Sequence, residues 1–441
     1  MTADLIGLLF LNLCFLAAGA GVTAVCGWWR GVPELGRSLG LAYLAGVAVF
    51  GVTAQLLYVL SASLARWQVL ALCAIAASGV VVGRQKVSDT SSRRRTPVWP
   101  AGVLALFLAL VAVDLWWQPL WTYDAWTFWT PKARALVALN GLHAPWFSAA
   151  DLPNKDYPLL LPAVEAAGFR FTGYETRLLD LQSLVLLIAF LRAVYDVGVA
   201  RARPLVLWAV LTLLVAAPSV VDQLASAEAD IPEAALFAAG GLCGYLWLTE
   251  RRRGSLQLAA VLAAGAASTK VEGVAFTIAL FVALAAASRR WPPLAAGAAA
   301  LAVGVLPWRL WMRAHDVANQ ASVGRFGLHG LVSHLPRAPE AAAYLLAKML
   351  DPRAWLVLVP LIAIVVVQAA RAGAMRTATF VVATATLAFA GLVLAYWTTP
   401  LPFHEHLATS ARRVITGIVF FGAAVSPLLD PRRPPSYPAG P

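Results

Sequence analysis

The sequence predicts an all-α protein that crosses a membrane many times, and three observations lead to this fold class. Of the 441 residues, 60% are apolar and 13% are charged, whereas a soluble domain has roughly 25% charged residues. The mean hydropathy is +0.73. Apolar runs of about 20 residues, long enough to cross the hydrocarbon layer as a helix, recur along the whole chain. A helix pairs every backbone group internally, as a bilayer requires.

Thirteen apolar runs are expected to span the membrane. They cover residues 3–27, 38–60, 66–83, 100–117, 177–197, 203–220, 231–249, 255–269, 271–287, 292–312, 354–370, 377–397 and 410–428. The first run is kept as a membrane helix because MTADLIGLLF has no basic residue and no cleavage site follows before Trp28. The apolar stretch 158–170 is counted as non-spanning because about 13 residues are too few to cross.

The distribution of basic residues predicts the orientation of the chain. Short loops rich in Lys and Arg face the cytoplasm. Alternate loops carry Arg30, Arg37, Arg84, Lys86, Arg93, Arg94, Arg95, Arg201, Arg203, Arg251, Arg252, Arg253, Arg289, Arg290, Arg371, Arg376, Arg432 and Arg433. The N-terminus and the long segment 118–176 are therefore expected outside and the C-terminus inside. The net charge of +12 indicates membrane topology, and no nucleic-acid partner is expected.

The chain is expected to have three parts. Residues 1–99 hold three N-terminal membrane helices and a basic cytoplasmic loop, and residues 100–428 hold the main transmembrane region with the external loop 118–176. Residues 429–441 form a Pro-rich cytoplasmic tail that is expected to be disordered. The four cysteines fall within apolar runs without paired spacing, so neither disulfides nor a metal site is indicated. No metal or other cofactor is expected.

The external segment 115–140 places five tryptophans around one carboxylate, Asp124. Tryptophan is typical of membrane interfaces. After Asp124, the apolar residues follow helical spacing, which predicts a helix along the outer membrane surface with Lys132 and Arg134 towards water. Asp124 then lies where this helix meets the membrane. It either caps the helix or serves a chemical role, and the sequence leaves both interpretations open.

Further acidic residues precede helices on the same external side. NKDYPLLLP places Asp156 and Tyr157 before a helix that Pro initiates, and SAEADIP places Glu228 and Asp230 before the seventh span. Helix capping would explain Asp156 and Asp230 as well as a binding role does. Asp230 and Glu233 have the spacing of a capping box.

Two charged motifs lie at helix ends. Lys270 and Glu272, in STKVEG, stand between two apolar runs with almost no loop, and charges at membrane depth are costly and usually functional. The alternative is an ion pair that only packs two helices. FHEHLATSARR places His404, Arg412 and Arg413 at the outer end of the last span. Adjacent outward arginines suggest an anionic partner, with snorkelling side chains as the alternative.

The order of the motifs YDAWTFWTPKA, DYPLLLP, EADIP, TKVEG and LATSARR resembles GT-C glycosyltransferases, which are polytopic enzymes that use lipid-linked sugars. Within this class, the motifs resemble those of the bacterial members grouped with the protein O-mannosyltransferases and the aminoarabinose transferase of lipid A, over about residues 100–428. The resemblance implies that Asp124 is the catalytic acidic residue and that 125–140 and 158–170 are juxtamembrane helices. The chain departs from the family in its three preceding spans and in its single Asp, and this weakens any metal assignment.

The resemblance implies a membrane-bound glycosyltransferase, in the bacterial inner membrane, with its active site on the extracytoplasmic face. The donor would be a sugar on polyprenyl phosphate, whose tail stays in the lipid bilayer, and the acceptor a hydroxyl of a glycan, lipid or protein. Asp124 would take the proton of the acceptor hydroxyl, and a single base implies inversion. The implied substrate-binding residues are Asp156, Tyr157, Glu228, Asp230, Lys270, Glu272, His404, Arg412 and Arg413. Among these, the outward cations Lys270, Arg412 and Arg413 would supply positive charge to the departing phosphate.

Two other functions stay open at this point. One is an oligosaccharide ligase or polymerase that uses a diphosphate-linked glycan. The other is a secondary transporter, which is expected to show repeated halves with broken helices at the midplane. The sequence shows no such repeat. A purely structural membrane protein would not need so many charged residues at one face.

Overall fold

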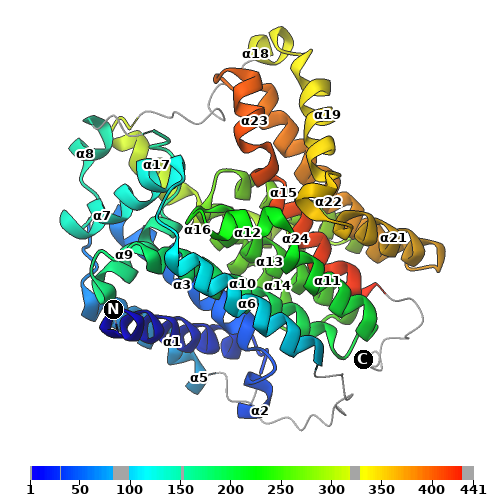
Figure 1. The fold of residues 1–441 in the computed structure, drawn as a ribbon, viewed down its shortest axis with the longest axis horizontal. Coiled ribbons are helices and arrows are strands. Elements are labelled where there is room, and N and C mark those ends of the chain that lie inside the picture. Colours follow the sequence, from blue (N-terminus) through cyan, green and yellow to red (C-terminus); the bar gives the residue numbers. More distant parts are fainter. Residues whose placement is uncertain (1, 30, 83–98, 150–152, 318–327, 430–441) are drawn as a thin grey trace.

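A computed structural model describes residues 2–29, 31–82, 99–149, 153–317 and 328–429. Within these ranges the chain is helical and contains no strand, which confirms the all-α class. Figure 1 shows the helices gathered in one bundle. The basic segment from Arg84 to Arg95, Arg30 and the tail from residue 430 lie outside the described residues.

Eight helical stretches of the described chain have the length and apolar character of a membrane span. They are Thr2–Val25 (α1), Leu39–Val59 (α3), Trp99–Trp117 (α6), Arg177–Gly198 (α10), Asp230–Glu250 (α13), Pro292–Ala314 (α16 and α17), Met375–Trp397 (α22) and Phe403–Leu428 (α23, α24 and a final 3₁₀ turn). A bent pair, Pro204–Ala216 (α11) with Pro218–Leu224 (α12), is a further candidate. Four apolar helices are shorter: Arg66–Val82 (α4 and α5), Ser255–Thr269 (α14), Glu272–Ser288 (α15) and Leu358–Arg371 (α21). Each of the thirteen predicted runs thus overlaps a helix, and eight of the runs correspond to helices that are long and apolar enough to cross a membrane.

The remaining described elements are short. They are Val32–Leu35 (α2), the π-helix Ala125–Trp129 (η1), Thr130–Ala138 (α7), Ala144–Ala149 (α8), Leu160–Thr172 (α9), Leu328–Ser333 (α18), Arg337–Met349 (α19) and Pro352–Trp355 (α20). The π-helix η1, α7, α8 and α9 all belong to the segment that the sequence places outside the membrane.

A proline bends the run that was expected to be one straight span at 203–220. Ala217 precedes Pro218 and has an extended backbone, with φ −63° and ψ 121°. The proline ring disfavours a helical conformation at the preceding residue and removes one backbone donor. The chain therefore turns by 53° between α11 and α12. This bend directs α12 and the loop after it towards the start of α13.

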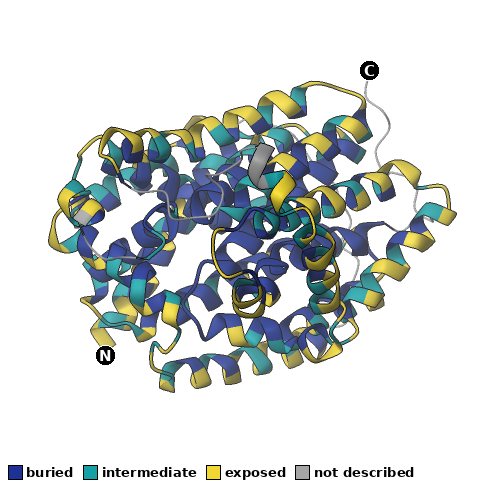
Figure 2. Cartoon of the chain, turned by 90° about the horizontal axis from the view of Figure 1, so that it is seen from above, coloured by how far each residue is buried: buried dark blue, intermediate teal, exposed yellow. Residues whose placement is uncertain are grey.

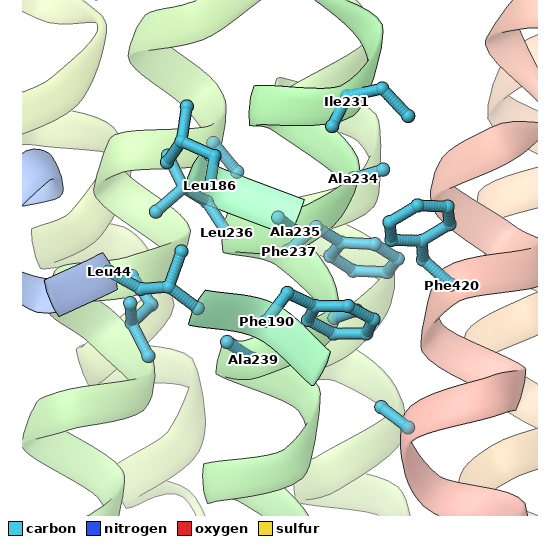
Figure 3. Packing of buried hydrophobic residues seen from close by; sticks show 14 of the residues in the cluster. Leu44, Leu186, Phe190, Ile231, Ala234, Ala235, Leu236, Phe237, Ala239 and Phe420 are labelled. Atoms are coloured by element: carbon cyan, nitrogen blue, oxygen red, sulfur yellow. The ribbon is translucent and has the colours of Figure 1, made fainter. Parts of the chain in front are cut away.

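Helix α13 is the centre of the bundle. In its apolar stretch of 18 residues 94% of the residues are buried, whereas in that of α6 17% are. Its small residues let neighbouring helices approach closely. A Cβ on Gly241, for example, would lie 2.4 Å from the ring of Phe421 on α24. Larger side chains fill the remaining space, as where Phe237 stacks on Phe276 of α15 with ring centroids 4.9 Å apart. Figure 3 shows this packing around Phe237, Phe190 and Phe420.

The outer helices carry apolar side chains on their exposed surface. On α6, Leu106, Leu110 and Val113 are all more than half exposed. Figure 2 shows the exposed residues along the outside of the bundle and the buried ones within it. Apolar residues outside and small or polar residues inside are expected where lipid, rather than water, surrounds the helices.

The three N-terminal helices are packed into the same bundle. Helix α1 crosses α3 so closely that a Cβ on Gly19 would lie 1.5 Å from the carbonyl oxygen of Ala42. A buried hydrogen-bond network joins these helices to α10, because Gln182 donates to Tyr43 (2.6 Å) and Asn12 donates to Gln182 (3.0 Å). Polar side chains buried at membrane depth are satisfied by one another in this way.

Candidate functional site

Asp124 follows α6 on a segment that is attached to the loop between α12 and α13. The indole nitrogen of Trp121 donates to the carbonyl oxygen of Ala225 (2.9 Å), and the hydroxyl of Thr122 donates to that of Ser226 (2.8 Å). These two bonds fix the chain immediately before Asp124. They bring its carboxylate next to the loop that carries Glu228.

The carboxylate of Asp124 does not cap a helix. Asp124 precedes η1, but its backbone is already helical, with φ −62° and ψ −40°, and its side chain makes no capping hydrogen bond. A capping Asp has an extended backbone and accepts from an amide two or three residues later. Asp124 Oδ2 accepts instead from Arg413 Nη2 at 2.8 Å. The capping interpretation is therefore wrong for this residue.

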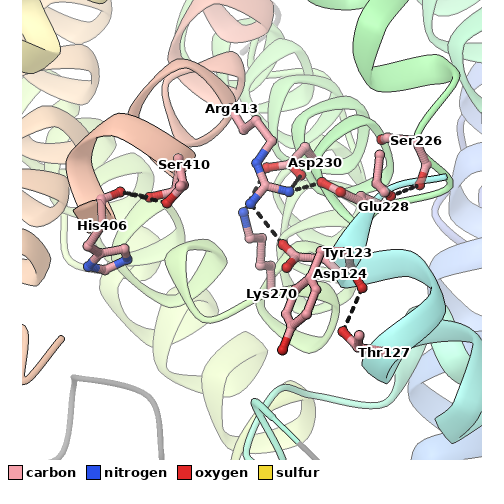
Figure 4. Close-up of polar contacts among 12 residues, drawn as sticks. Tyr123, Asp124, Thr127, Ser226, Glu228, Asp230, Lys270, His406, Ser410 and Arg413 are labelled. Carbon is pink, nitrogen blue, oxygen red and sulfur yellow. Dashed lines mark hydrogen bonds and ion pairs between the residues drawn. The ribbon is translucent and has the colours of Figure 1, made fainter. Parts of the chain in front are cut away.

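Arg413 on α23 joins carboxylates from two distant segments of the chain. Nη2 donates to Asp124, and Nη1 donates to Glu228 Oε2 and lies 4.0 Å from Asp230 Oδ2. Figure 4 shows the guanidinium between these three side chains. Both sides of the planar fork are thus used, as in the strongest charge-assisted contacts.

Lys270 extends this arrangement towards α15. Its backbone is extended (φ −146°), which ends α14 and leaves the side chain between α14 and α15. Nζ lies 2.7 Å from Asp230 Oδ1 and 3.3 Å from Glu272 Oε1. Burial alone lowers the pKa of Lys270, but the charges of Asp230 and Glu272 raise it well above its ordinary value.

Asp230 thus connects the two cations, and a continuous network results. We call it the ion-pair cluster, and it consists of Asp124, Glu228, Asp230, Lys270, Glu272 and Arg413. These six are candidates that the sequence identified from four separate motifs. Their side chains come from the segment after α6, the loop before α13, the junction of α14 with α15, and α23.

The capping box expected for Asp230 and Glu233 is not formed. Helix α13 begins at Asp230, its N-cap residue is Ala229, and no side chain caps it. Glu233 is buried one turn later, within electrostatic reach of Lys270 and Glu272, and Oε1 has no hydrogen-bond partner in the described chain. Glu233 is a site residue that the sequence analysis missed. Its spacing of three from Asp230 on one helix face was the available signal.

Tyr157 borders the ion-pair cluster. Its ring packs against Phe128 and Trp129, with centroids 5.6 and 5.4 Å away. Burial and the negative charge of Glu272 raise the pKa of the Tyr157 hydroxyl well above its ordinary value, so it stays a neutral donor. A neutral phenol beside carboxylates is suited to hydrogen-bonding a polar ligand.

Asp156 lies behind Tyr157 and outside the ion-pair cluster. It is fully buried, its carboxylate is 3.9 Å from Arg309 on α17, and its carbonyl oxygen accepts from Trp308. Helix α9 begins at Leu160 with Leu159 as its N-cap, so Asp156 does not cap it. Its position is that of a residue that holds the loop before α9 against α17.

The expectation that Lys132 faces water is wrong. Lys132 has no exposed surface, and Nζ donates to the carbonyl oxygens of Asn154 (2.8 Å), Lys155 (3.2 Å) and Tyr157 (3.1 Å). Helix α7 packs this side against the loop 153–159 instead. Burial lowers the pKa of Lys132 to about 7, although the charge of Asp156 raises it. Lys132 therefore supports the loop that presents Tyr157.

His404 and Arg412 lie outside the ion-pair cluster. The side chain of His404 is 80% exposed and its Nδ1 is 3.3 Å from Glu340 of α19. Arg412 pairs with the exposed Asp222 of α12 at 2.6 Å. Successive residues of a helix point about 100° apart, so only one of two adjacent arginines can face the cluster. On α23 that residue is Arg413.

Within the described ranges, no group of three or more His, Cys, Asp or Glu side chains is arranged to hold a metal ion. Comparisons of the chain with protein-family models, with curated proteins and with solved structures find no match.

Proposed function

We propose that this chain is a membrane glycosyltransferase that moves a sugar from a polyprenyl-phosphate donor to an acceptor hydroxyl at the ion-pair cluster. One observation carries the proposal. Asp124, from the segment after α6, and Arg413, from α23, meet in one cluster although 289 positions separate them. A base for the nucleophile and a cation for a phosphate leaving group are the two groups that this transfer needs.

Asp124 is the proposed general base. Its side chain is 25% exposed, so the carboxylate is reachable from outside while Arg413 holds one oxygen. It would accept the proton of the acceptor hydroxyl as that oxygen attacks the anomeric carbon and the bond to the donor phosphate breaks. A base of this kind contributes about 10² to 10⁴ in rate. One displacement by one nucleophile inverts the anomeric centre.

Arg413 is the proposed contact to the departing phosphate. Its side chain is 24% exposed, whereas that of Lys270 is 7% exposed and lies between two carboxylates. A phosphate that enters the cluster can replace a carboxylate at the fork of Arg413, since both accept two hydrogen bonds. Lys270 then keeps Asp230 in place. Arg412, paired with Asp222 at the surface, is not part of this step.

The remaining polar groups would bind the sugar. Glu228 and Asp230 offer carboxylate oxygens and Tyr157 a neutral hydroxyl around the same space. Sugar hydroxyls both donate and accept, so such a mixed set can orient them. The positions of the sugar hydroxyls that these groups bind would determine which sugar the enzyme accepts.

The placement in the membrane belongs to the same proposal. The eight spans, the bent α11–α12 pair and the four shorter apolar helices together support the prediction of about thirteen crossings. With alternate basic loops in the cytoplasm, the ion-pair cluster lies on the extracytoplasmic face of the bacterial inner membrane. A polyprenyl tail in the bilayer would then deliver its phosphate to the cluster from the side.

One observation favours a second candidate, a secondary transporter. The bent α11–α12 pair leads into the cluster, and broken helices beside buried charges are typical of transporter binding sites. A third candidate, the oligosaccharide ligase or polymerase, differs only in the diphosphate of its donor.

Three measurements on the purified full chain separate these functions. In nanodiscs with a membrane extract as acceptor, we expect labelled sugar to leave polyprenyl-phosphate donors and polyprenyl phosphate to accumulate. Turnover confined to diphosphate-linked glycans would identify the ligase class. Sugar uptake into sealed liposomes without any covalent product would establish the transporter and overturn the proposal.

A further inference from the structure

A second group of charges lies at the opposite end of α13. This helix has 21 residues, or about 30 Å at 1.5 Å per residue. It begins at Asp230 in the ion-pair cluster and is followed directly by Arg251. In the same way α15 begins at Glu272, in the cluster, and is followed by Arg289 and Arg290.

A third helix brings another arginine to this end. Arg376, in the first turn of α22, donates from Nε to the carbonyl oxygen of Ala287 at the end of α15 (3.0 Å). Helices α13, α15 and α22 pack against one another. After burial, the positive charges of Arg290 and Arg376 are what lower the pKa of Arg251. Arg290 and Arg376 are thus both within electrostatic reach of Arg251, and we call these three residues the arginine site.

Among the described residues, no carboxylate pairs with the arginine site. All three side chains are exposed, and none forms an ion pair with Asp or Glu in the chain that the structure describes. By contrast, Arg201, in the loop after α10, pairs with Glu250 at the end of α13, at 2.5 Å. Like charges held together without a counter-ion repel one another, and an anion bound between them relieves the repulsion.

The surroundings indicate which anion fits. Trp291 follows Arg290 and is 73% exposed, and the ring of Trp247 lies 4.3 Å from the Arg251 guanidinium. Tryptophan beside arginine is typical of the level of lipid headgroups. Closer to the middle of the bundle, α15 and α22 expose Val282 and Val382. An apolar surface next to the arginine site suits acyl chains, which a free phosphate ion does not have.

We propose that the arginine site binds the phosphate of an anionic phospholipid, at the membrane face opposite the ion-pair cluster. Basic pockets between transmembrane helices are suited to such headgroups. The lipid would join α13, α15 and α22 at one end, while the ion-pair cluster joins α13 and α15 at the other. The proposal requires that the chain crosses a membrane, and it is independent of sugar transfer.

The test uses the full chain purified in a neutral detergent. Cardiolipin or phosphatidylglycerol should raise the melting temperature and remain bound in native mass spectra, whereas phosphatidylcholine and inorganic phosphate should do neither. Equal stabilisation by phosphatidylcholine would overturn the charge recognition, and equal stabilisation by inorganic phosphate would overturn the lipid. These comparisons use the wild-type protein, so they do not depend on whether a variant folds.

Variants then locate the site. The double change Arg290→Gln with Arg376→Gln should weaken anionic lipid retention by about tenfold or more, because charge-assisted contacts to phosphate are lost. The control is Arg371→Gln, since Arg371 at the end of α21 carries the same charge but is not one of the two that act on Arg251. Equal retention by the double variant and by Arg371→Gln would contradict the assignment.

Discussion

Arg413 donates a hydrogen bond of 2.8 Å from Nη2 to the carboxylate of Asp124 and another from Nη1 to Glu228. In the proposed reaction, Asp124 acts on the attacking hydroxyl and Arg413 on the departing phosphate, at opposite faces of the anomeric carbon. Without donor they neutralise each other. A donor phosphate that binds Arg413 would therefore compete with Asp124 and release the carboxylate for the acceptor, so that donor binding precedes base action.

The first prediction separates the two adjacent arginines. Arg413→Gln should reduce apparent donor affinity about tenfold or more, because one charge-assisted phosphate contact is lost. It should also destabilise the fold, since Glu228 is buried and loses its partner. Arg412→Gln is the matched control, because its exposed pair with Asp222 contributes about 0 to 1 kcal/mol. Donor titrations of both variants test this, and an equal loss in both would contradict the role of Arg413.

The second prediction concerns the pair of Lys270 and Asp230. Both side chains are buried, so Lys270→Met removes the nearest cation from Asp230 and from Glu272 and should cost about 3 to 5 kcal/mol. Adding Asp230→Asn should recover part of the lost stability, because an amide is less costly to bury than an unpaired charge. A double-mutant cycle on thermal stability measures the coupling. Strictly additive effects would show that the two residues act independently.

The third prediction is a pH dependence from Lys132. Its pKa falls from an ordinary 10.5 to about 7 on folding. Between these values the unfolded chain keeps a proton that the folded chain has lost, so the free energy of unfolding rises with pH from about 7 to 10.5. Below about pH 7 both states are protonated and the contribution is constant. Stability measured at several pH values for wild type and Lys132→Met should diverge above pH 7, and a constant difference would refute it.

The sequence predicts the helices well and the exact faces less well. The sequence predicts that Trp126, Ala133 and Leu136 share one face of a helix along the membrane, but Ala133 and Leu136 are buried in the protein whereas Trp126 is exposed. The π-helix Ala125–Trp129 is the physical reason, because a π turn holds more residues than an α turn and rotates Trp126 away from the buried face. Nothing in the residue pattern marks this change of period.

The candidate site was predictable as a set of charges but not as a set of contacts. The motifs identify Asp230 and Lys270, yet capping and ion pairing use the same residue types at the same helix ends. Only the packing of α13 against α14 places the two side chains 2.7 Å apart. The choice of Arg413 over Arg412 likewise depends on the rotation of α23, which adjacent arginines in a sequence do not encode.

The fourth prediction places the two charged ends on opposite sides of the membrane. Ser148 of α8 and Arg253, after α13, are both exposed. In a variant without the four native cysteines, Ser148→Cys should react with an impermeant maleimide in intact cells, and Arg253→Cys only after permeabilisation. The reverse pattern would invert the orientation and move the ion-pair cluster to the cytoplasm.

The transfer rate of Asp124→Asn is the most direct test of the proposed chemistry. Asparagine keeps the shape of the side chain and a hydrogen-bond acceptor for Arg413, but it removes the base. The matched control is Asp114→Asn, because Asp114 is an exposed acid on α6 whose carboxylate accepts a hydrogen bond from Gln118 (2.8 Å). We expect release of polyprenyl phosphate to fall by about 10² or more in Asp124→Asn and to stay at the wild-type rate in Asp114→Asn. Near-normal release by a folded Asp124→Asn would contradict the account.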